Sequence, residues 1–221
     1  MSSSKNIQIS VIIPVFNQER FIGRCLRSIL NQSIPRTDYE IILIDDASTD
    51  NTPKIVEKFA SELQLIKHSE NKGLPASLNS GIKLANGRFI IRLDSDDYVH
   101  HEYLNILSLY LKMNSHVDAV SCDYIEVDNK ENVLTRKCHK DDPIGCGIMF
   151  RIEQLIEIGL YDEEQHWHEE RELMERFLKS FSLEHLNFPL YRYRKHDNNM
   201  TSNQEMMDKY KDILDHKSSL K

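Results

Sequence analysis

Carboxylates gather at two points of this sequence, and each point directly follows a short apolar run. The denser group is Asp94-Ser95-Asp96-Asp97, in which three carboxylates stand within four residues. Like charges this close repel one another unless a cation neutralises them. Oxygen ligands of this kind suit Mg²⁺ or Mn²⁺, and such ions in turn bind phosphate oxygens. Because Asp is also common in turns, the residue types alone leave a solvated acidic turn open.

The second acidic group is Asp45-Asp46, which follows the apolar run Ile41 to Ile44. Carboxylates at such a position can accept hydrogen bonds from a nucleobase N–H or from ribose hydroxyls. The residues from Ser48 to Thr52 are typical of a turn that leads into a helix. We therefore assign ligand binding to Asp45 and Asp46, and turn formation to the residues after them.

Two further polar segments stand in the second half of the chain. His166-Trp167-His168-Glu169-Glu170 precedes a helical pattern, where acidic residues also complement the helix dipole. Its two histidines suggest zinc, but no third and fourth ligands stand at a recognisable spacing. Tyr191 to His196 is basic and aromatic, so it is either a solvated edge strand or a positive rim facing a diphosphate. In the second case His196 is a further metal ligand.

The elements that position these residues follow from the spacing of apolar side chains. Strands are expected at residues 7–15, 40–44, from 65, 88–93 and 117–127, and helices at 18–31, 53–63, 75–85 and 101–112. Such alternation implies a parallel sheet covered by helices on both faces. Ligands of such sheets bind beyond the carboxyl ends of the strands, so three polar strand ends should converge there: 14–18, 45–50 and 94–97.

The second half is less regular. We expect a turn at 128–131, a strand entered from 145–150, helices at 152–158 and 169–181, a short strand at 190–194 and a helical tail from 203. A length of 221 residues suggests a single domain. If the polar strand ends bind a ligand, the ligand-binding half would span about 1–115, the other half about 116–200, and the tail about 201–221.

Composition narrows the class of protein. A formal net charge of -7 disfavours nucleic-acid binding, which depends on neutralising phosphates. The four cysteines form no C-x-x-C pair, which fits reduced thiols in a cytoplasmic protein. No apolar run approaches the roughly 20 residues that span a bilayer. We therefore expect a protein that does not span the membrane, with peripheral association at its inner face left open.

Taken together, five segments resemble glycosyltransferase family 2, the inverting transferases with the GT-A fold. In order they are Val11 to Asn17, Ile44 to Asp50, Asn71-Lys72-Gly73 with Asn79-Ser80-Gly81, Leu93 to Asp97, and Glu169-Glu170-x-Glu172-Leu173 with Arg176. The match covers about residues 7 to 200. The resemblance implies an α/β fold whose central sheet is mostly parallel and flanked by helices.

The resemblance also implies roles for matched positions. Nucleotide-sugar binding falls to Pro14, Val15, Asn17, Asp45, Asp46, Lys72, Asp94 and Ser95. Asp46 matches the carboxylate that touches the base, and Lys72 lies in the loop that helps to hold it. Asp94 and Asp96 match the two acids of the D-x-D motif, of which Asp96 is the direct metal ligand. His196 resembles the late histidine that completes the metal–diphosphate site, and Glu170 matches the catalytic base.

The implied reaction is transfer of a sugar from a nucleotide-diphosphate sugar, with a UDP-sugar expected, to a hydroxyl of a glycan or lipid-linked acceptor. Mn²⁺ or Mg²⁺ is the implied cofactor, and cell-envelope polysaccharide or glycoconjugate synthesis is the implied setting. Glu170 would deprotonate the acceptor, which attacks the anomeric carbon in a single displacement with inversion. No protein nucleophile is then required.

Three departures and two rival functions stay open. The acidic pair is Glu169-Glu170 instead of Glu-Asp, Leu78 stands where Arg is common, and Cys146 interrupts a Gly-Gly-like segment that often touches the acceptor. A nucleotidyltransferase would show a glycine-rich loop after the first strand, yet no glycine precedes Gly23. A degenerate transferase kept as a binding or scaffold protein would have little need of the acidic cluster and the acidic base.

Overall fold

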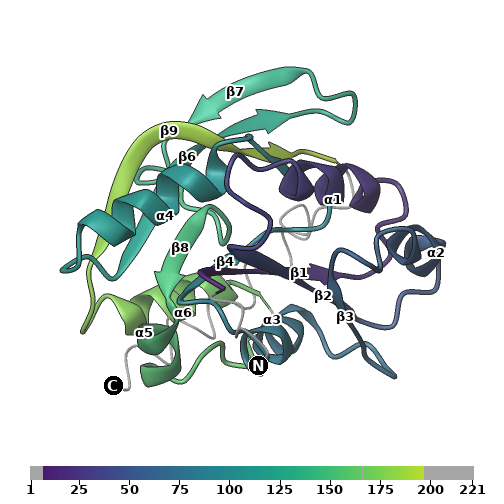
Figure 1. The fold of residues 1–221 in the computed structure, drawn as a ribbon, viewed down its shortest axis with the longest axis horizontal. Coiled ribbons are helices and arrows are strands. Elements are labelled where there is room, and N and C mark those ends of the chain that lie inside the picture. Colours follow the sequence, from purple (N-terminus) through teal and green to yellow (C-terminus); the bar gives the residue numbers. More distant parts are fainter. Residues whose placement is uncertain (1–6, 166, 197–221) are drawn as a thin grey trace.

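A computed structural model describes residues 7–165 and 167–196 of the chain. Within them the strands form one sheet with helices on both faces (Figure 1). Its first part is parallel and runs in the order β3, β2, β1, β4, where the strands are β1 (Ile9–Val15), β2 (Tyr39–Asp45), β3 (Gln64–Lys67) and β4 (Phe89–Arg92). The carboxyl ends of these strands therefore meet at one edge.

The second part of the sheet is mixed. Its strands are β5 (Tyr98–Val99), β6 (Ala119–Val127), β7 (Val133–Lys137), β8 (Ile148–Arg151) and β9 (Leu183–Arg194). β8 lies antiparallel between β4 and β6, and β9 is parallel to β6. β5 pairs with β9, and β7 pairs with β6. The predicted α/β class is confirmed, and antiparallel pairing enters only through β5, β7 and β8 among the described strands.

The two faces of the sheet carry separate apolar cores. On one face lie α1 (Ile22–Leu30), α2 (Thr52–Glu57) and α4 (Tyr103–Met113), and on the other α3 (Leu74–Ile82), α5 (Ile152–Glu157) and α6 (Glu169–Phe177) (Figure 1). Ile13 of β1 packs into the first core and its neighbour Ile12 into the second, because successive side chains of a strand point to opposite faces. Burial on both faces explains why β1 and β2 are mostly apolar, with polar side chains only at Ser10, Glu40 and Asp45.

Element boundaries differ from the sequence prediction in two places that matter for the site. α1 begins at Ile22 and not at residue 18. The backbone N–H groups of Gln18 and Glu19 donate to Thr52 and Asp50 instead, so this stretch is a turn beside the next loop. β9 begins at Leu183, well before the predicted 190–194. Its first half was not predicted because it is partly exposed and shows no apolar alternation.

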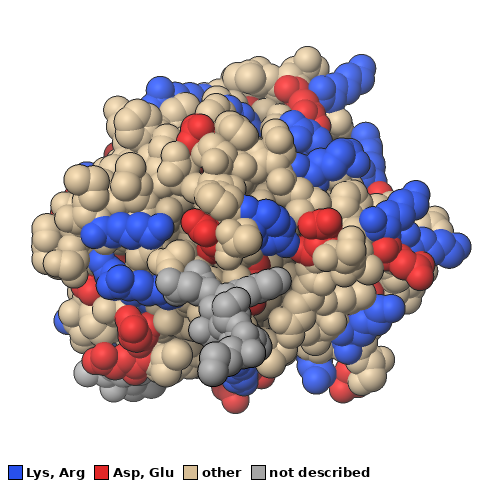
Figure 2. Space-filling model, in the orientation of Figure 1, with Lys and Arg blue, Asp and Glu red and all other residues tan. Residues whose placement is uncertain are grey.

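Charges are mixed on the face of the molecule shown in Figure 2, where basic and acidic side chains are interspersed. No described helix combines the length and the apolar character needed to cross a membrane. The helical tail expected from residue 203 lies outside the described residues, as does the first histidine of the 166–170 segment.

Candidate active site

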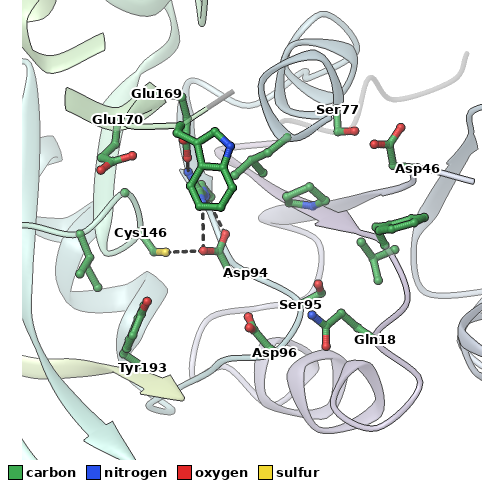
Figure 3. A pocket seen from close by; sticks show the side chains of 18 of the residues that line it. Gln18, Asp46, Ser77, Asp94, Ser95, Asp96, Cys146, Glu169, Glu170 and Tyr193 are labelled. Atoms are coloured by element: carbon green, nitrogen blue, oxygen red, sulfur yellow. Dashed lines mark hydrogen bonds and ion pairs between the residues drawn. The ribbon is translucent and has the colours of Figure 1, made fainter. Parts of the chain in front are cut away.

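A cavity of about 350 Å³ opens at the carboxyl ends of the parallel strands. All three polar strand ends expected to converge contribute to its wall, through Pro14, Val15, Phe16, Gln18, Asp46, Asp94, Ser95 and Asp96. Further wall residues come from the second half of the chain, and they include Cys146, Glu169, Glu170 and Tyr193. Figure 3 shows Asp46 on one side of this cavity, Glu170 on the other, and Asp94 between them. We call this space the first cavity.

Asp46 organises the loop that follows β3. Its carboxylate accepts the backbone N–H groups of Lys72 at 2.9 Å and Gly73 at 2.8 Å, and it contacts His68 Nδ1 at 2.6 Å. Gly73 has a φ of 87°, a conformation that favours glycine at this turn. Lys72 thus contributes its backbone to Asp46, while its side chain is exposed and does not line the first cavity.

Asn17 and Asp45 lie next to the first cavity without lining it. Asn17 Oδ1 accepts the backbone N–H of Thr49 at 2.8 Å, and the Asn17 N–H donates to Ser48 Oγ at 3.0 Å. Asp45 Oδ1 accepts the N–H of Ser48 at 3.0 Å. These bonds tie the loop after β1 to the loop after β2, so both residues shape the wall that other residues present.

Phe16 and Gln18, which the sequence analysis did not single out, line the first cavity on either side of Asn17. Phe16 is 44% exposed although it directly follows a buried strand. The sequence signal for Phe16 was a large aromatic residue at the polar end of a predicted strand. An exposed apolar side chain at such a place offers a surface on which a ligand can pack.

Arg92 links the D-x-D segment to the acidic pair. Its guanidinium binds Asp94 through Nε at 2.6 Å and Nη2 at 3.0 Å, and it binds Glu169 Oε1 through Nη1 at 2.9 Å. Cys146 Sγ donates to the same Asp94 carboxylate at 2.8 Å. The sequence analysis missed Arg92, although an Arg two residues before Asp94 on an extended chain points to the same side.

The two members of the acidic pair have different environments. Glu169 is 5% exposed, and burial, followed by the negative charge of Glu170, raises its pKa to about 7. Arg92 opposes this rise, but its charge is shared with Asp94. Glu170 is half-buried and lines the first cavity. Of the pair, Glu170 is therefore the more exposed carboxylate, while Glu169 is held by Arg92 in the wall of the first cavity.

A second cavity, of about 780 Å³, adjoins the first. The two share the wall residues Pro143, Ile144, His168, Glu170 and Tyr193. The second cavity is otherwise lined by side chains of mixed character, apolar ones such as Ile148, Met174 and Leu183 and charged ones such as Lys140, Arg171 and Lys195. Glu170 thus stands at the junction of the two cavities.

Asp96 and His196 meet although 100 residues separate them in the sequence. His196 Nε2 lies 2.9 Å from Asp96 Oδ2, and the imidazole ring stacks on Phe21 with 5.2 Å between ring centroids. Asp96 lines the first cavity, and His196 lies behind it in contact with Asp96. An oxygen and a nitrogen atom this close fit within the coordination sphere of a single divalent cation.

Asp97 is a buried residue whose hydrogen bonds serve the fold. It is 1% exposed and accepts hydrogen bonds from the Tyr191 hydroxyl at 2.8 Å and the Arg194 N–H at 2.7 Å. Burial, together with the charges of Asp96 and Asp94, raises its pKa well above the usual range. Asp97 also lies near Asp94 and Cys146, and one potential ligand atom of each falls within 4.8 Å of the others.

The basic–aromatic segment before His196 is only partly a rim of the site. Arg194 is 2% exposed, and its Nε donates to the backbone carbonyl of Asp96 at 2.8 Å. Within this segment, the Arg194 side chain is therefore neither solvated nor exposed at a rim, because it holds the acidic loop. Tyr193 does face both cavities.

In metal-free protein, Glu169 is expected to make the free energy of unfolding fall as pH rises. A carboxyl whose pKa is raised from 4.5 to about 7 in the folded state binds its proton more tightly there than in the unfolded chain. Its contribution is therefore full below the lower value and lost between the two, by on the order of 3 kcal/mol. Urea unfolding across this pH window should show a steeper decline for the wild type than for Glu169→Gln. Parallel profiles for the two proteins would contradict the raised pKa.

Comparison with known proteins gives the same picture of the fold. A family described as Glycosyl transferase family 2 matches residues 10–167. The poly(ribitol-phosphate) beta-glucosyltransferase of Bacillus spizizenii is 42% identical over 102 residues, which are 44% of this chain and 16% of that protein. The chain therefore spans much less than the length of this relative.

Two solved structures share the fold. TarS 1-349 of Staphylococcus aureus in complex with UDP-GlcNAc has a TM-score of 0.77 at 24% identity, covering 94% of this chain and 65% of that one. The mannosyltransferase PcManGT of Pyrobaculum calidifontis, in complex with GDP-Man and Mn²⁺, has a TM-score of 0.70 at 20% identity, with coverages of 90% and 59%. Together with the family match, which includes both acidic strand ends, these likenesses show a GT-A fold, and the chain belongs to glycosyltransferase family 2.

Proposed function

We propose that this chain is a metal-dependent inverting glycosyltransferase that moves a sugar from a nucleotide-diphosphate sugar to an acceptor hydroxyl. The observation that carries the proposal is the position of Glu170 at the junction of two cavities, with Asp96 on the wall of the first. A transferase with a single displacement needs a donor space, an acceptor space and a base between them. The family to which the chain belongs supports the same reaction.

The nucleotide would occupy the part of the first cavity between β1 and β2. Phe16 offers an exposed aromatic surface there, and Pro14 and Val15 supply the apolar wall beneath it. Asp46, fixed by the N–H groups of Lys72 and Gly73, presents the edge of its carboxylate to the same space. A ring stacked on the aromatic side chain and hydrogen bonds to a rigid carboxylate would hold a nucleoside in one orientation.

Asp96 and His196 are the residues that would hold a divalent cation, Mn²⁺ or Mg²⁺. When bound, such an ion stabilises the negative charge of a departing diphosphate. Ser95 and Asp94 line the cavity beside Asp96, where the donor's ribose and sugar would lie. Arg92 and Cys146 hold the Asp94 carboxylate in place, which lowers the side-chain entropy that the site must lose when a donor binds.

Glu170 would take the proton of the acceptor hydroxyl as that oxygen attacks the anomeric carbon. The bond from the sugar to the nucleotide diphosphate breaks on the opposite face, so the anomeric configuration inverts. Glu169 would keep Arg92 and the start of α6 in position. The mixed apolar and charged lining of the second cavity suits a glycan or lipid-linked acceptor.

A UDP-sugar is the donor that we propose, used in cell-envelope polysaccharide or glycoconjugate synthesis at the cytoplasmic face of the membrane. The structure of TarS with UDP-GlcNAc supports the donor, and the similarity to a poly(ribitol-phosphate) beta-glucosyltransferase supports the synthesis of a cell-envelope polymer. The structure of PcManGT with GDP-Man and Mn²⁺ supports the metal and provides the alternative donor class.

A screen of nucleotide release tests the proposal. The purified chain is incubated with UDP-, GDP-, dTDP- and CMP-sugars, with Mn²⁺ or with chelator, and the released products are identified. Slow release of UDP that depends on Mn²⁺ is expected even without acceptor. Release of pyrophosphate in a parallel incubation with nucleoside triphosphates and sugar 1-phosphates would indicate a nucleotidyltransferase. Nucleotide binding without any turnover would indicate a degenerate binding protein.

His196→Ala is expected to weaken binding of UDP with Mn²⁺ by on the order of 10-fold or more, because one metal ligand is lost. The fold should be retained, since His196 follows β9 and lies outside the described helices and strands. Isothermal titration with UDP and Mn²⁺ measures the effect. His101→Ala, which alters an exposed histidine remote from both cavities, should bind as the wild type does. Equal affinity of the two variants would remove His196 from the metal site.

A further inference from the structure

A second group of potential metal ligands lies away from the D-x-D segment. It consists of Asp123 on β6, Cys138 just after β7 and His185 on β9, and one ligand atom of each falls within 4.8 Å of the others. His185 Nε2 lies 3.0 Å from Asp123 Oδ1 and 3.7 Å from Cys138 Sγ. Three segments that are far apart in the sequence thus direct a carboxylate, a thiol and an imidazole at one point.

The distances between these atoms match a shared ion. With the bond lengths typical of tetrahedral zinc, a sulfur and a nitrogen ligand stand about 3.5 Å apart and a nitrogen and an oxygen ligand about 3.3 Å apart. The distances of 3.7 Å and 3.0 Å are within a few tenths of an ångström of these values. Only small side-chain movements would therefore bring all three atoms into bonding range.

Ser121 supports the metal-binding tautomer of His185. Ser121 Oγ lies 3.4 Å from the backbone carbonyl of Glu184 and 3.0 Å from His185 Nδ1. When the hydroxyl donates to Glu184, Ser121 Oγ can accept the proton of Nδ1, and the lone pair of Nε2 then points to the Asp123 carboxylate. This is the tautomer that a metal ion between His185 and Asp123 requires.

Asp123 adds an independent observation. The residue is 2% exposed, and its Oδ1 accepts no hydrogen bond from any described residue despite its contact with His185. Its other oxygen, Oδ2, is held by Arg136 Nη2 at 2.8 Å. A buried carboxylate oxygen without a hydrogen bond is costly unless a cation takes that position. The Arg136 and Ser121 contacts correspond to the outer partners that orient metal ligands in proteins.

We propose that Asp123, Cys138 and His185 form a Zn²⁺ site, separate from the oxygen-rich site at Asp96. Binding would replace the thiol proton of Cys138, which passes to solvent, by a Zn–S bond. Sulfur and imidazole ligands select zinc or Co²⁺ over Mn²⁺ and Mg²⁺. Since His185 lines the second cavity, a water or an oxygen of the bound acceptor would complete the tetrahedron from there.

The ion would fix the loop that separates the two cavities. Cys138 begins a segment that continues through Pro143 and Ile144, which line both cavities, to Cys146 at Asp94. A bond from Cys138 to β6 and β9 through zinc would anchor the start of this segment to the sheet.

Cobalt spectroscopy tests the site directly. The full chain is stripped with chelator, titrated with Co²⁺ in the presence of excess Mg²⁺, and observed by absorption. One tightly bound Co²⁺ with tetrahedral d–d bands and a sulfur-to-metal charge-transfer band is expected, and Zn²⁺ should bleach both. Cys138→Ser should lose the charge-transfer band and bind Zn²⁺ on the order of 100-fold more weakly, and Ser121→Ala should weaken binding by about 10–100-fold.

Controls separate this site from the others. Cys146→Ser should keep the charge-transfer band, because its sulfur lies at Asp94 and not at His185. His101→Asn should bind Zn²⁺ as the wild type does. Zn²⁺ should also raise the thermal unfolding midpoint of the wild type but not of His185→Gln, which provides a readout if one variant folds poorly. Co²⁺ bound without a charge-transfer band, or a band that survives in Cys138→Ser, would overturn the proposal.

Discussion

Glu170→Gln is expected to lower sugar transfer by on the order of 10²–10⁴-fold, the usual contribution of a general base. Gln keeps the size of the side chain at the junction of the two cavities and removes only its basicity. Binding of the donor and the metal should stay nearly unchanged, because the substitution leaves Asp96, His196 and the proposed nucleotide surface around Phe16 untouched. Single-turnover transfer to the natural acceptor and titration with UDP and Mn²⁺ measure the two quantities separately.

Glu169→Gln is the matched control, since it changes the adjacent carboxylate of the same helix turn. It should cost less transfer than Glu170→Gln, because Glu169 is buried against Arg92 and does not present its carboxylate as the base. If Glu169→Gln abolishes transfer while Glu170→Gln stays active, the base is the other member of the pair. If both variants keep near-full activity, a carboxylate base at this site is wrong.

Asp96→Ala should abolish metal-dependent binding of the nucleoside diphosphate, with affinity for UDP and Mn²⁺ lowered by on the order of 100-fold or more. The loss follows from removing the acid that faces the cavity beside His196. Without metal, the thermal unfolding midpoint should be unchanged or higher, because the variant relieves repulsion with Asp94 and Asp97. Calorimetry with and without chelator measures both effects.

Glu57→Ala, which removes an exposed acid of α2, is the control for a change of charge and should bind UDP with Mn²⁺ normally. Collapse of the metal-free Asp96→Ala variant would show that Asp96 serves the fold and not a ligand. Binding and turnover that ignore chelator in the wild type would exclude the proposed metal requirement.

Much of the fold could be predicted from the sequence because its first half has strong local signals. β1 and β2 are buried on both faces, so they appear as nearly continuous apolar runs that end at Pro14-Val15 and Asp45-Asp46. Parallel order then brings their polar ends together without further information. The first seven residues of β9 were not predicted as a strand, because they include Asn187 and Pro189 and pair with β6 through an irregular register. That pairing is a long-range contact with no local pattern.

The location of the site could be predicted better than the hydrogen bonds and ion pairs among its residues. Asp96 and Glu170 lie on the first cavity, but Asn17 and Asp45 hold loops instead of facing it. Short polar side chains after a strand serve either purpose, and only the fold decides which backbone N–H groups come within reach. Arg92 was missed for the same reason, since its partner Glu169 is 77 residues away.

The Arg92 bridge makes the two halves of the site thermodynamically dependent on one another. One guanidinium is shared by Asp94, on the donor side, and by Glu169, next to the proposed base. If a ligand draws Asp94 away from Arg92, more of the positive charge of Arg92 acts on Glu169. That charge favours the ionised form of the Glu169 carboxyl. Donor binding would then release protons near neutral pH, and by reciprocity donor affinity would rise as Glu169 loses its proton. The Arg92 ion pairs would thus respond to the presence of a donor beside Glu170, the carboxylate that we propose as the base.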